Sequence, residues 1–191
     1  MHRALNKTHQ LVICGILVAL GTLIPMVMPV RIPFGPYTAT LASHVPILLA
    51  AFLSMPITIG TAIGTTLGFI LGGFAPVVVW RAASHIFFAL FMALLFQKLG
   101  TRSFGKVLLI ALAGSVIHAI AEVAVIAVDF SIAGVGQQVV NGQSYTIQLF
   151  LAVTFLGTIA HHCMDFAIAW VVQQALTRAH MMPSFAGTQK L

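Results

Sequence analysis

Charged residues, and acidic residues above all, are scarce in this sequence. Only 6% of its 191 residues are charged, and three acids, Glu122, Asp129 and Asp165, stand against nine Lys and Arg. Hydrophobic residues make up 60% of the chain, and its mean hydropathy is +1.06. So little polar surface cannot cover a soluble globule. The composition therefore excludes an ordinary soluble domain and predicts an integral membrane protein.

Motifs for nucleotide hydrolysis and metal catalysis are absent as well. No glycine-rich phosphate loop ends in Lys and Ser or Thr, so the chain by itself hydrolyses no nucleotide. No His-Glu-x-x-His occurs, and the adjacent pair His161 and His162 points to different faces of a helix, so we expect no metal site and no cofactor. Cys14 and Cys163 lie inside apolar runs, which predicts packed thiols rather than a disulfide.

Six apolar segments predict an all-α membrane protein with six transmembrane helices in one domain, residues 1–191. Because about 20 residues are needed to cross the hydrocarbon, the second and third segments are short. Only Ser54, Met55 and Pro56 separate these two, and a single long helix would reduce the count to five spans. We favour six, since Pro56 suits the first turn of a new helix. The segments lie at 10–28, 40–54, 57–73, 76–97, 105–128 and 147–176.

The basic residues predict how the chain sits in the membrane. The net charge is +6, yet the basic residues cluster in short polar segments between apolar runs, so we expect lipid and not nucleic acid as their surroundings. Six spans place all but Arg31 and Arg81 on one face, which predicts cytoplasmic termini and a multi-pass protein of the bacterial cell membrane. The residues on that face are Arg3, Lys7, Lys98, Arg102, Lys106, Arg178 and Lys190.

Small residues form a stripe on the third segment. Gly60, Gly64, Gly68 and Gly72 recur every four residues, which lets a neighbouring helix approach closely. The stripe fits either packing inside the chain or a face for a partner. A shorter small-residue pair, Gly15 and Ala19, lies on the first segment.

Polar residues inside the apolar segments carry most of the functional signal. Arg81 with His85, and His118 with Glu122, are pairs four apart, so each pair shares a helix face. We expect these two pairs to lie at a similar level in the outer half of the membrane and to meet at one cavity. His44 lies near the outer end of the second segment. His161 and Asp165 form a third pair, which we expect to lie deeper and to satisfy itself.

Arg81 raises the sharpest question, because arginine stays charged and a charge inside a membrane needs an anion or water. Glu122 is one candidate anion, and a ligand carboxylate is another. Arg81 lies in the second turn after Pro76, where the helix start already favours negative charge. Trp80 and Tyr37 either offer flat surface to a ring or serve as interfacial anchors.

Two polar connections predict a cap over the cavity. The stretch 30–38 carries two prolines and a glycine, and the stretch 129–146 is the longest polar interruption, with Asn141 and Gly142 as a turn signal. Both fall on the outer face in the six-span arrangement.

Three stretches of the sequence resemble a known family. ALGTLIPMVMPVRIPFGPYTATLASHVPILLAAFLSMP, GTTLGFILGG and VVVWRAASHIFFALF are similar to the S components of energy-coupling factor transporters, and among them to the niacin-specific S components of lactic acid bacteria and their relatives. The likeness covers roughly residues 10–175. It implies a transport subunit that is not itself an enzyme.

The resemblance also implies a mechanism and partners. Such a subunit binds a vitamin from outside with high affinity, joins a transmembrane coupling protein that carries two cytoplasmic ATPases, and topples in the bilayer. Gly15 and Ala19 stand where the family has an Ala-x-x-x-Ala partner motif. For nicotinate, Arg81 would anchor the carboxylate. The expected partners of the ligand are His85, His118, Glu122, His44, Trp80, Tyr37 and Asn141.

Three alternatives stay open. Pantothenate also carries a carboxylate, but it is flexible and needs more hydrogen-bond partners. Nickel and cobalt S components begin with Met-His as this chain does, although here a basic segment follows. An enzyme that uses His161 as a general base oriented by Asp165 is the third, and no nucleophile is evident beside that pair.

Overall fold

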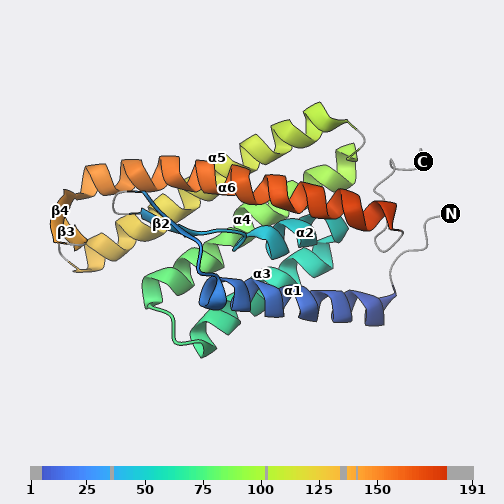
Figure 1. The fold of residues 1–191 in the computed structure, drawn as a ribbon, viewed down its shortest axis with the longest axis horizontal. Coiled ribbons are helices and arrows are strands. Elements are labelled where there is room, and N and C mark those ends of the chain that lie inside the picture. Colours follow the sequence, from blue (N-terminus) through green and yellow to red (C-terminus); the bar gives the residue numbers. More distant parts are fainter. Residues whose placement is uncertain (1–5, 35–36, 102, 134–136, 141, 180–191) are drawn as a thin grey trace.

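The computed structural model describes residues 6–34, 37–101, 103–133, 137–140 and 142–179. The chain folds into a helical bundle with two short antiparallel hairpins (Figure 1). The hairpins pair β1 with β2 and β3 with β4. The predicted helical class is confirmed, and the two predicted outer loops contain the hairpins. The elements are α1 Lys7–Val27, β1 Arg31–Phe34, β2 Tyr37–Thr40, α2 Val45–Leu53, α3 Met55–Leu71, α4 Pro76–Leu99, α5 Phe104–Ala133, β3 Gln137–Val140, β4 Gln143–Thr146 and α6 Ile147–Arg178.

The helix starts follow local sequence signals. Ser54 adopts an extended backbone between α2 and α3, and its side chain accepts a hydrogen bond from the Ile57 backbone N–H. Pro56 and Pro76 lie in the first turns of α3 and α4, where a missing N–H costs nothing. The prediction that the second and third segments form two helices is therefore confirmed.

Two predicted boundaries need correction. The segment predicted at 40–54 is helical only over Val45–Leu53, whose nine residues are all buried and rise about 14 Å, less than the hydrocarbon thickness. Thr40 ends β2, and the turn after it leads into α2. At the other connection α5 continues to Ala133, so Asp129 lies in a helix and not in the predicted loop.

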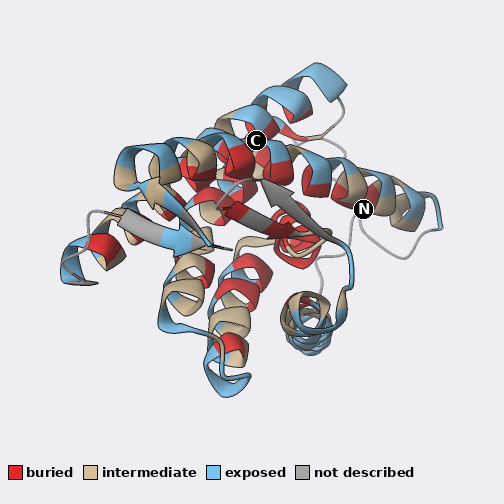
Figure 2. Cartoon of the chain, turned by 60° about the vertical axis from the view of Figure 1, so that its left-hand side comes forward, coloured by how far each residue is buried: buried red, intermediate tan, exposed pale blue. Residues whose placement is uncertain are grey.

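The outer surface of the bundle is apolar, as a membrane requires. In the described part of the chain four helices, α1, α4, α5 and α6, are long and apolar enough to cross a membrane, and α3 is a shorter apolar helix. Figure 2 shows buried residues on the inward sides of the helices and exposed ones on their outward sides. On α1 the exposed large apolar side chains are Leu11, Val12, Ile16, Leu20, Leu23, Met26 and Val27.

The glycine stripe of α3 packs against α1. A Cβ atom added at Gly60 would come within 2.6 Å of Cys14 Sγ, and one at Gly64 within 2.5 Å of Val18 Cγ2. These positions therefore have to stay without side chains for the two helices to touch. Of the two interpretations, packing inside the chain is confirmed for this part of the stripe.

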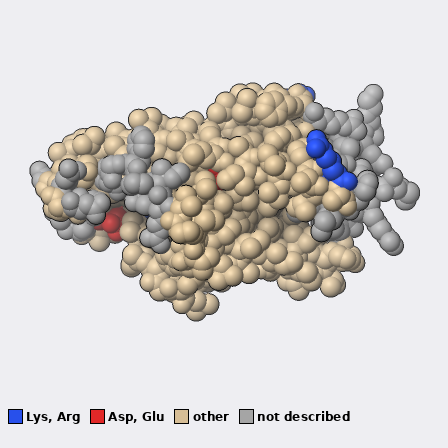
Figure 3. All heavy atoms as spheres, in the orientation of Figure 1, with Lys and Arg blue, Asp and Glu red and all other residues tan. Residues whose placement is uncertain are grey.

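The two ends of the bundle differ in charge. The helix ends that carry Lys7, Lys98, Lys106 and Arg178 gather at one end, and both hairpins lie toward the other (Figure 1). Figure 3 shows Lys and Arg atoms on the visible face at the end away from the hairpins. This arrangement agrees with the charge pattern that led us to predict cytoplasmic termini; the side of the membrane stays a prediction.

Candidate ligand-binding site

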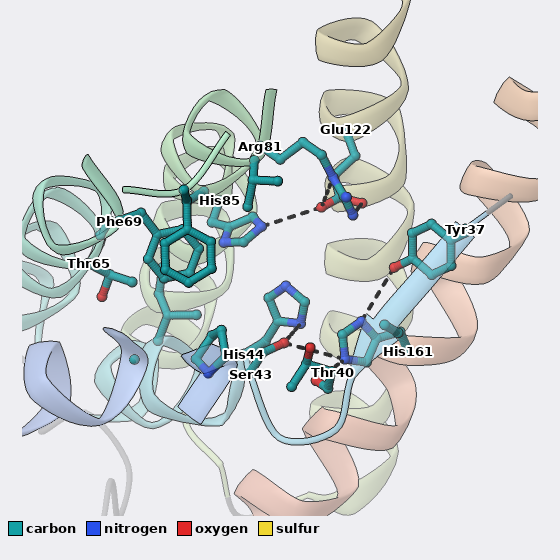
Figure 4. A pocket seen from close by; sticks show the side chains of 18 residues that line it. Tyr37, Thr40, Ser43, His44, Thr65, Phe69, Arg81, His85, Glu122 and His161 are labelled. Atoms are coloured by element: carbon teal, nitrogen blue, oxygen red, sulfur yellow. Dashed lines mark hydrogen bonds and ion pairs between the residues drawn. The ribbon is translucent and has the colours of Figure 1, made fainter. Parts of the chain in front are cut away.

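A cavity of about 400 Å³ lies between α1, α3, α4 and the β1–β2 hairpin. Its volume falls in the range of about 300–1,000 Å³ that is usual for small-molecule sites. Figure 4 shows polar side chains from several elements around it. The polar lining residues are Tyr37, Thr40, Ser43, His44, Thr65, Arg81, His85, Glu122 and His161.

Arg81 and Glu122 form a two-pronged ion pair at this cavity. Arg81 Nε donates to Glu122 Oε1 over 3.1 Å, and Nη2 donates to Oε2 over 3.0 Å. Thr158 Oγ1 donates to the same Oε2 over 2.6 Å. Glu122 is buried, whereas 23% of the Arg81 side chain is exposed. The pairing of the two residues is confirmed, and Glu122 occupies one of the two bidentate edges of the guanidinium.

Tyr37 reaches the cavity from β2. Its ring centroid lies 5.5 Å from Arg81 Cζ, close enough for a cation–π contact. Its hydroxyl is 3.4 Å from His161 Nδ1. Burial raises the pKa of this phenol above its usual value, so the hydroxyl stays protonated. A Cβ at Gly157 would lie 2.7 Å from the ring, so α6 needs glycine there.

Four histidines converge beside the ion pair. The rings of His85 and His118 each lie 4.7 Å from that of His44 between centroids, and His161 lies 4.6 Å from it. His85 Nε2 and His118 Nε2 stand 3.5 and 3.6 Å from Glu122 Oε1. The structure thus brings together the two helix pairs that were predicted to meet, with the predicted His44 beside them, but His118 is fully buried and does not line the cavity. Whether these residues touch a ligand stays a prediction.

Asp165 holds the turn that leads into α2. Its carboxylate accepts hydrogen bonds from the backbone N–H groups of Ala42, over 2.7 Å, and His44, over 2.9 Å. It also lies 3.1 Å from His44 Nδ1 and 3.1 Å from His161 Nε2. Ala42 has a positive φ of 66°, so the turn is strained and these bonds offset that strain.

The expectation that His161 and Asp165 form a separate, deeper pair is wrong. His161 lines the same cavity, its Nε2 donates to the Thr40 carbonyl oxygen, and its Nδ1 lies 3.4 Å from the Tyr37 hydroxyl. A signal for this was present in the sequence. Thr158, His161, His162 and Asp165 follow the spacing i, i+3, i+4, i+7, which makes one polar stripe along α6.

The remaining predicted residues lie elsewhere. Trp80 is 65% exposed and does not line the cavity, so it offers no stacking surface there and suits the alternative role of interfacial anchor. Asn141 lies outside the described residues. Gly15 and Ala19 are exposed on α1, and their contact with a partner stays a prediction.

Two groups of side chains have the composition of a metal site. Ligand atoms of His44, His85, His118 and Glu122 lie within 4.8 Å of one another, and so do those of His44, His161 and Asp165. The sequence motifs pointed away from a metal, because no His-Glu-x-x-His occurs and the adjacent His161 and His162 point to different faces of a helix.

Comparison with known proteins identifies the family. The niacin transporter NiaX of Lactococcus lactis subsp. cremoris (strain MG1363) is 31% identical over 193 residues, which cover 97% of this chain and 82% of that protein. This chain belongs to the NiaX family. No family model matches the sequence, and no solved structure matches it. The resemblance to niacin-specific transport components is confirmed, and the chain is a multi-pass transport protein of the cell membrane.

Proposed function

We propose that this chain is the membrane-embedded binding subunit for nicotinate in an energy-coupling factor transporter. The observation that carries the proposal is a partly exposed guanidinium, Arg81, in a cavity of a chain related to a niacin transporter. A carboxylate-bearing aromatic ligand matches the free edge of that guanidinium and the size of the cavity.

Arg81 would bind the carboxylate of the ligand. Glu122 takes Nε and one Nη2 hydrogen, which leaves the end-on edge, made by Nη1 and the second Nη2 hydrogen. That edge can donate two parallel hydrogen bonds to a carboxylate. Glu122 and Thr158 then act as positioning residues, because they fix the plane of the guanidinium.

The ring of the ligand would lie between aromatic and hydroxyl groups. Tyr37 and Phe69 both line the cavity and supply flat apolar surface. Thr65 lines it too, and its hydroxyl is buried without a hydrogen-bond partner among the described residues. A pyridine nitrogen accepts a hydrogen bond, so it would satisfy this hydroxyl.

The direction of transport and the partners follow from the family resemblance and the charge pattern. The hairpin end of the bundle would face outside and capture the ligand, and the basic end would face the cytoplasm. Gly15 and Ala19 would contact the transmembrane coupling protein, whose two ATPases supply the energy. Both residues are exposed on α1, and a Cβ at Gly15 would have no atom within 4 Å, which supports this part of the proposal.

The first test is isothermal titration of the detergent-purified chain with nicotinate, nicotinamide and pantothenate. We expect tight binding of nicotinate and a large loss for the uncharged amide. Arg81→Ala should weaken nicotinate binding at least 30-fold, about 2 kcal/mol, and Arg81→Lys by about tenfold, because lysine keeps the charge but not the fork.

Lys98→Ala is the matched control, since it removes a cation near the other end of α4 and should leave the affinity unchanged. Tighter binding of pantothenate would agree with a vitamin-binding transport subunit and would overturn the assignment of nicotinate as its ligand. Equal binding by folded Arg81→Ala protein would remove Arg81 from the site.

A further inference from the structure

The histidine cluster is the feature that the proposed function leaves unexplained. His85 Nε2 and His118 Nε2 are buried and have no hydrogen-bond partner among the described residues. Buried polar atoms are nearly always satisfied, so two orphans side by side point to a missing partner. We propose that His44, His85, His118 and Glu122 bind one divalent transition-metal ion of the zinc class.

The distances suit such an ion better than direct hydrogen bonds. Glu122 Oε1 lies 3.5 Å from His85 Nε2 and 3.6 Å from His118 Nε2, which is too long for a good hydrogen bond. Ligands about 2.0–2.1 Å from a tetrahedral zinc ion stand roughly 3.4 Å apart. These separations are therefore close to the edges of a coordination tetrahedron, and all four ligand atoms lie within 4.8 Å of one another.

Groups outside the cluster orient its ligands. His44 Nδ1 lies 3.1 Å from the Asp165 carboxylate, which leaves Nε2 for the ion. His118 Nδ1 lies 3.1 Å from His162 Nδ1, which again leaves Nε2. Glu122 is held by Arg81 and Thr158. A histidine whose second nitrogen bonds to a carboxylate is the usual arrangement around protein-bound zinc.

The donor atoms select the class of metal. Three imidazoles and one carboxylate suit Zn²⁺, Co²⁺ or Ni²⁺, whereas Mg²⁺ and Ca²⁺ prefer oxygen alone. Neither Cys14 nor Cys163 belongs to the group, so thiolate sites for copper(I) are not supported here. His44, His85 and Glu122 also line the cavity, so the ion would lie in its wall.

Charge balance gives the ion a role in ligand binding, a step that rests on the proposed function. With neutral histidines, the charged side chains described at the cluster are Arg81, Glu122 and Asp165, which leave one net negative charge. That field repels a carboxylate. A divalent ion turns the balance to one positive charge, which the anion nicotinate would neutralise.

The test is a metal titration of the full chain, purified without a polyhistidine tag and stripped with a chelator. Calorimetry with Zn²⁺ should show one ion per chain, and Co²⁺ should give the intense visible bands of four-coordinate cobalt. His85→Ala and His118→Ala should each weaken Zn²⁺ binding at least ~100-fold, and His162→Ala by about 10- to 100-fold.

His9→Ala is the matched control, because its ring is exposed near the start of α1 and bonds to Asn6 instead. His85 borders the cavity, so its variant is checked first for thermal unfolding and then for binding. No saturable Zn²⁺ binding, an octahedral cobalt spectrum, or wild-type affinity in folded His85→Ala protein each overturns the site.

Nicotinate titrations on the same samples separate this inference from the proposed function. We expect metal-free protein to bind nicotinate at least tenfold more weakly than zinc-loaded protein. Zinc binding without nicotinate binding overturns the function and keeps the metal site. Nicotinate binding that is equally tight with and without the ion overturns the role of the metal.

Discussion

The bundle buries two carboxylates, Glu122 and Asp165, and satisfies them in opposite ways. Glu122 faces side chains: a guanidinium, a hydroxyl and two distant imidazoles. Asp165 faces the backbone, since two main-chain N–H groups of the turn before α2 donate to it, and two imidazoles complete its shell.

The difference indicates a structural role for Asp165 and a ligand-binding role for Glu122. Backbone N–H groups have no rotamers and cannot turn away from the carboxylate. Asp165 therefore fixes the end of the hairpin and the start of α2 against α6. The partners of Glu122 are side chains, and two of them, Arg81 and His85, line the cavity. We infer that Asp165 stabilises the fold around the site and that Glu122 affects ligand affinity.

The largest effect should come from Asp165→Asn. One of the two backbone donors at Ala42 and His44 would then face an amide NH₂ group, and an unsatisfied buried donor costs about 1–3 kcal/mol. We expect a loss of stability of about 3 kcal/mol, measured as a lower midpoint of thermal unfolding in detergent. Asp129→Asn, near the end of α5, should stay within about 0.5 kcal/mol of wild type. Similar midpoints for both variants would contradict a tethering role.

Glu122→Gln should act mainly on the ligand. Glutamine keeps an acceptor for Arg81 Nε but loses the charge that fixes the fork, and a hydrogen bond to a charged group contributes about 1.5 kcal/mol. We therefore expect about tenfold weaker nicotinate binding in calorimetry. Its unfolding midpoint should fall less than that of Asp165→Asn. A larger fall of the midpoint for Glu122→Gln than for Asp165→Asn would contradict this assignment of a structural role to Asp165 and a binding role to Glu122.

Tyr37→Phe should have the smallest effect at neutral pH, because the ring stays beside Arg81 and only long hydroxyl contacts disappear. Its mark should be a pH dependence. Burial raises the pKa of Tyr37, so the unfolded chain releases this proton first, and the folded state loses stability as pH rises above about 10. Thermal unfolding between pH 8 and 11 should show a shallower decline for Tyr37→Phe than for wild type. Parallel declines would show that this phenol is not buried.

The sequence predicted the long helices well and the second segment poorly. Hydropathy and proline positions placed α1, α3, α4 and α6 to within about three residues. They gave no sign that Thr40 ends a strand, because the turn after it is held by Asp165, more than 120 residues away. Such long-range hydrogen bonds leave no trace in local composition.

The site was predicted in part for a related reason. Helical spacing joined Arg81 to His85 and His118 to Glu122. The shortage of acids made Glu122 one of two candidate anions for Arg81, and the structure pairs them. Spacing along the sequence could not fix the depth of His161 along a helix of 32 residues. It also placed Trp80 beside the site, although the Trp80 side chain is 65% exposed and does not line the cavity.

The close contact of α1 with the glycines of α3 has one more consequence. It brings Gly21 and Pro25 to the wall of the cavity, while Gly15 and Ala19 remain on the outer surface of the same helix. The cavity and the predicted docking surface thus lie on two sides of a single helix, whose thickness is about 10 Å. A ligand in the cavity would therefore contact the same helix whose outer surface carries Gly15 and Ala19.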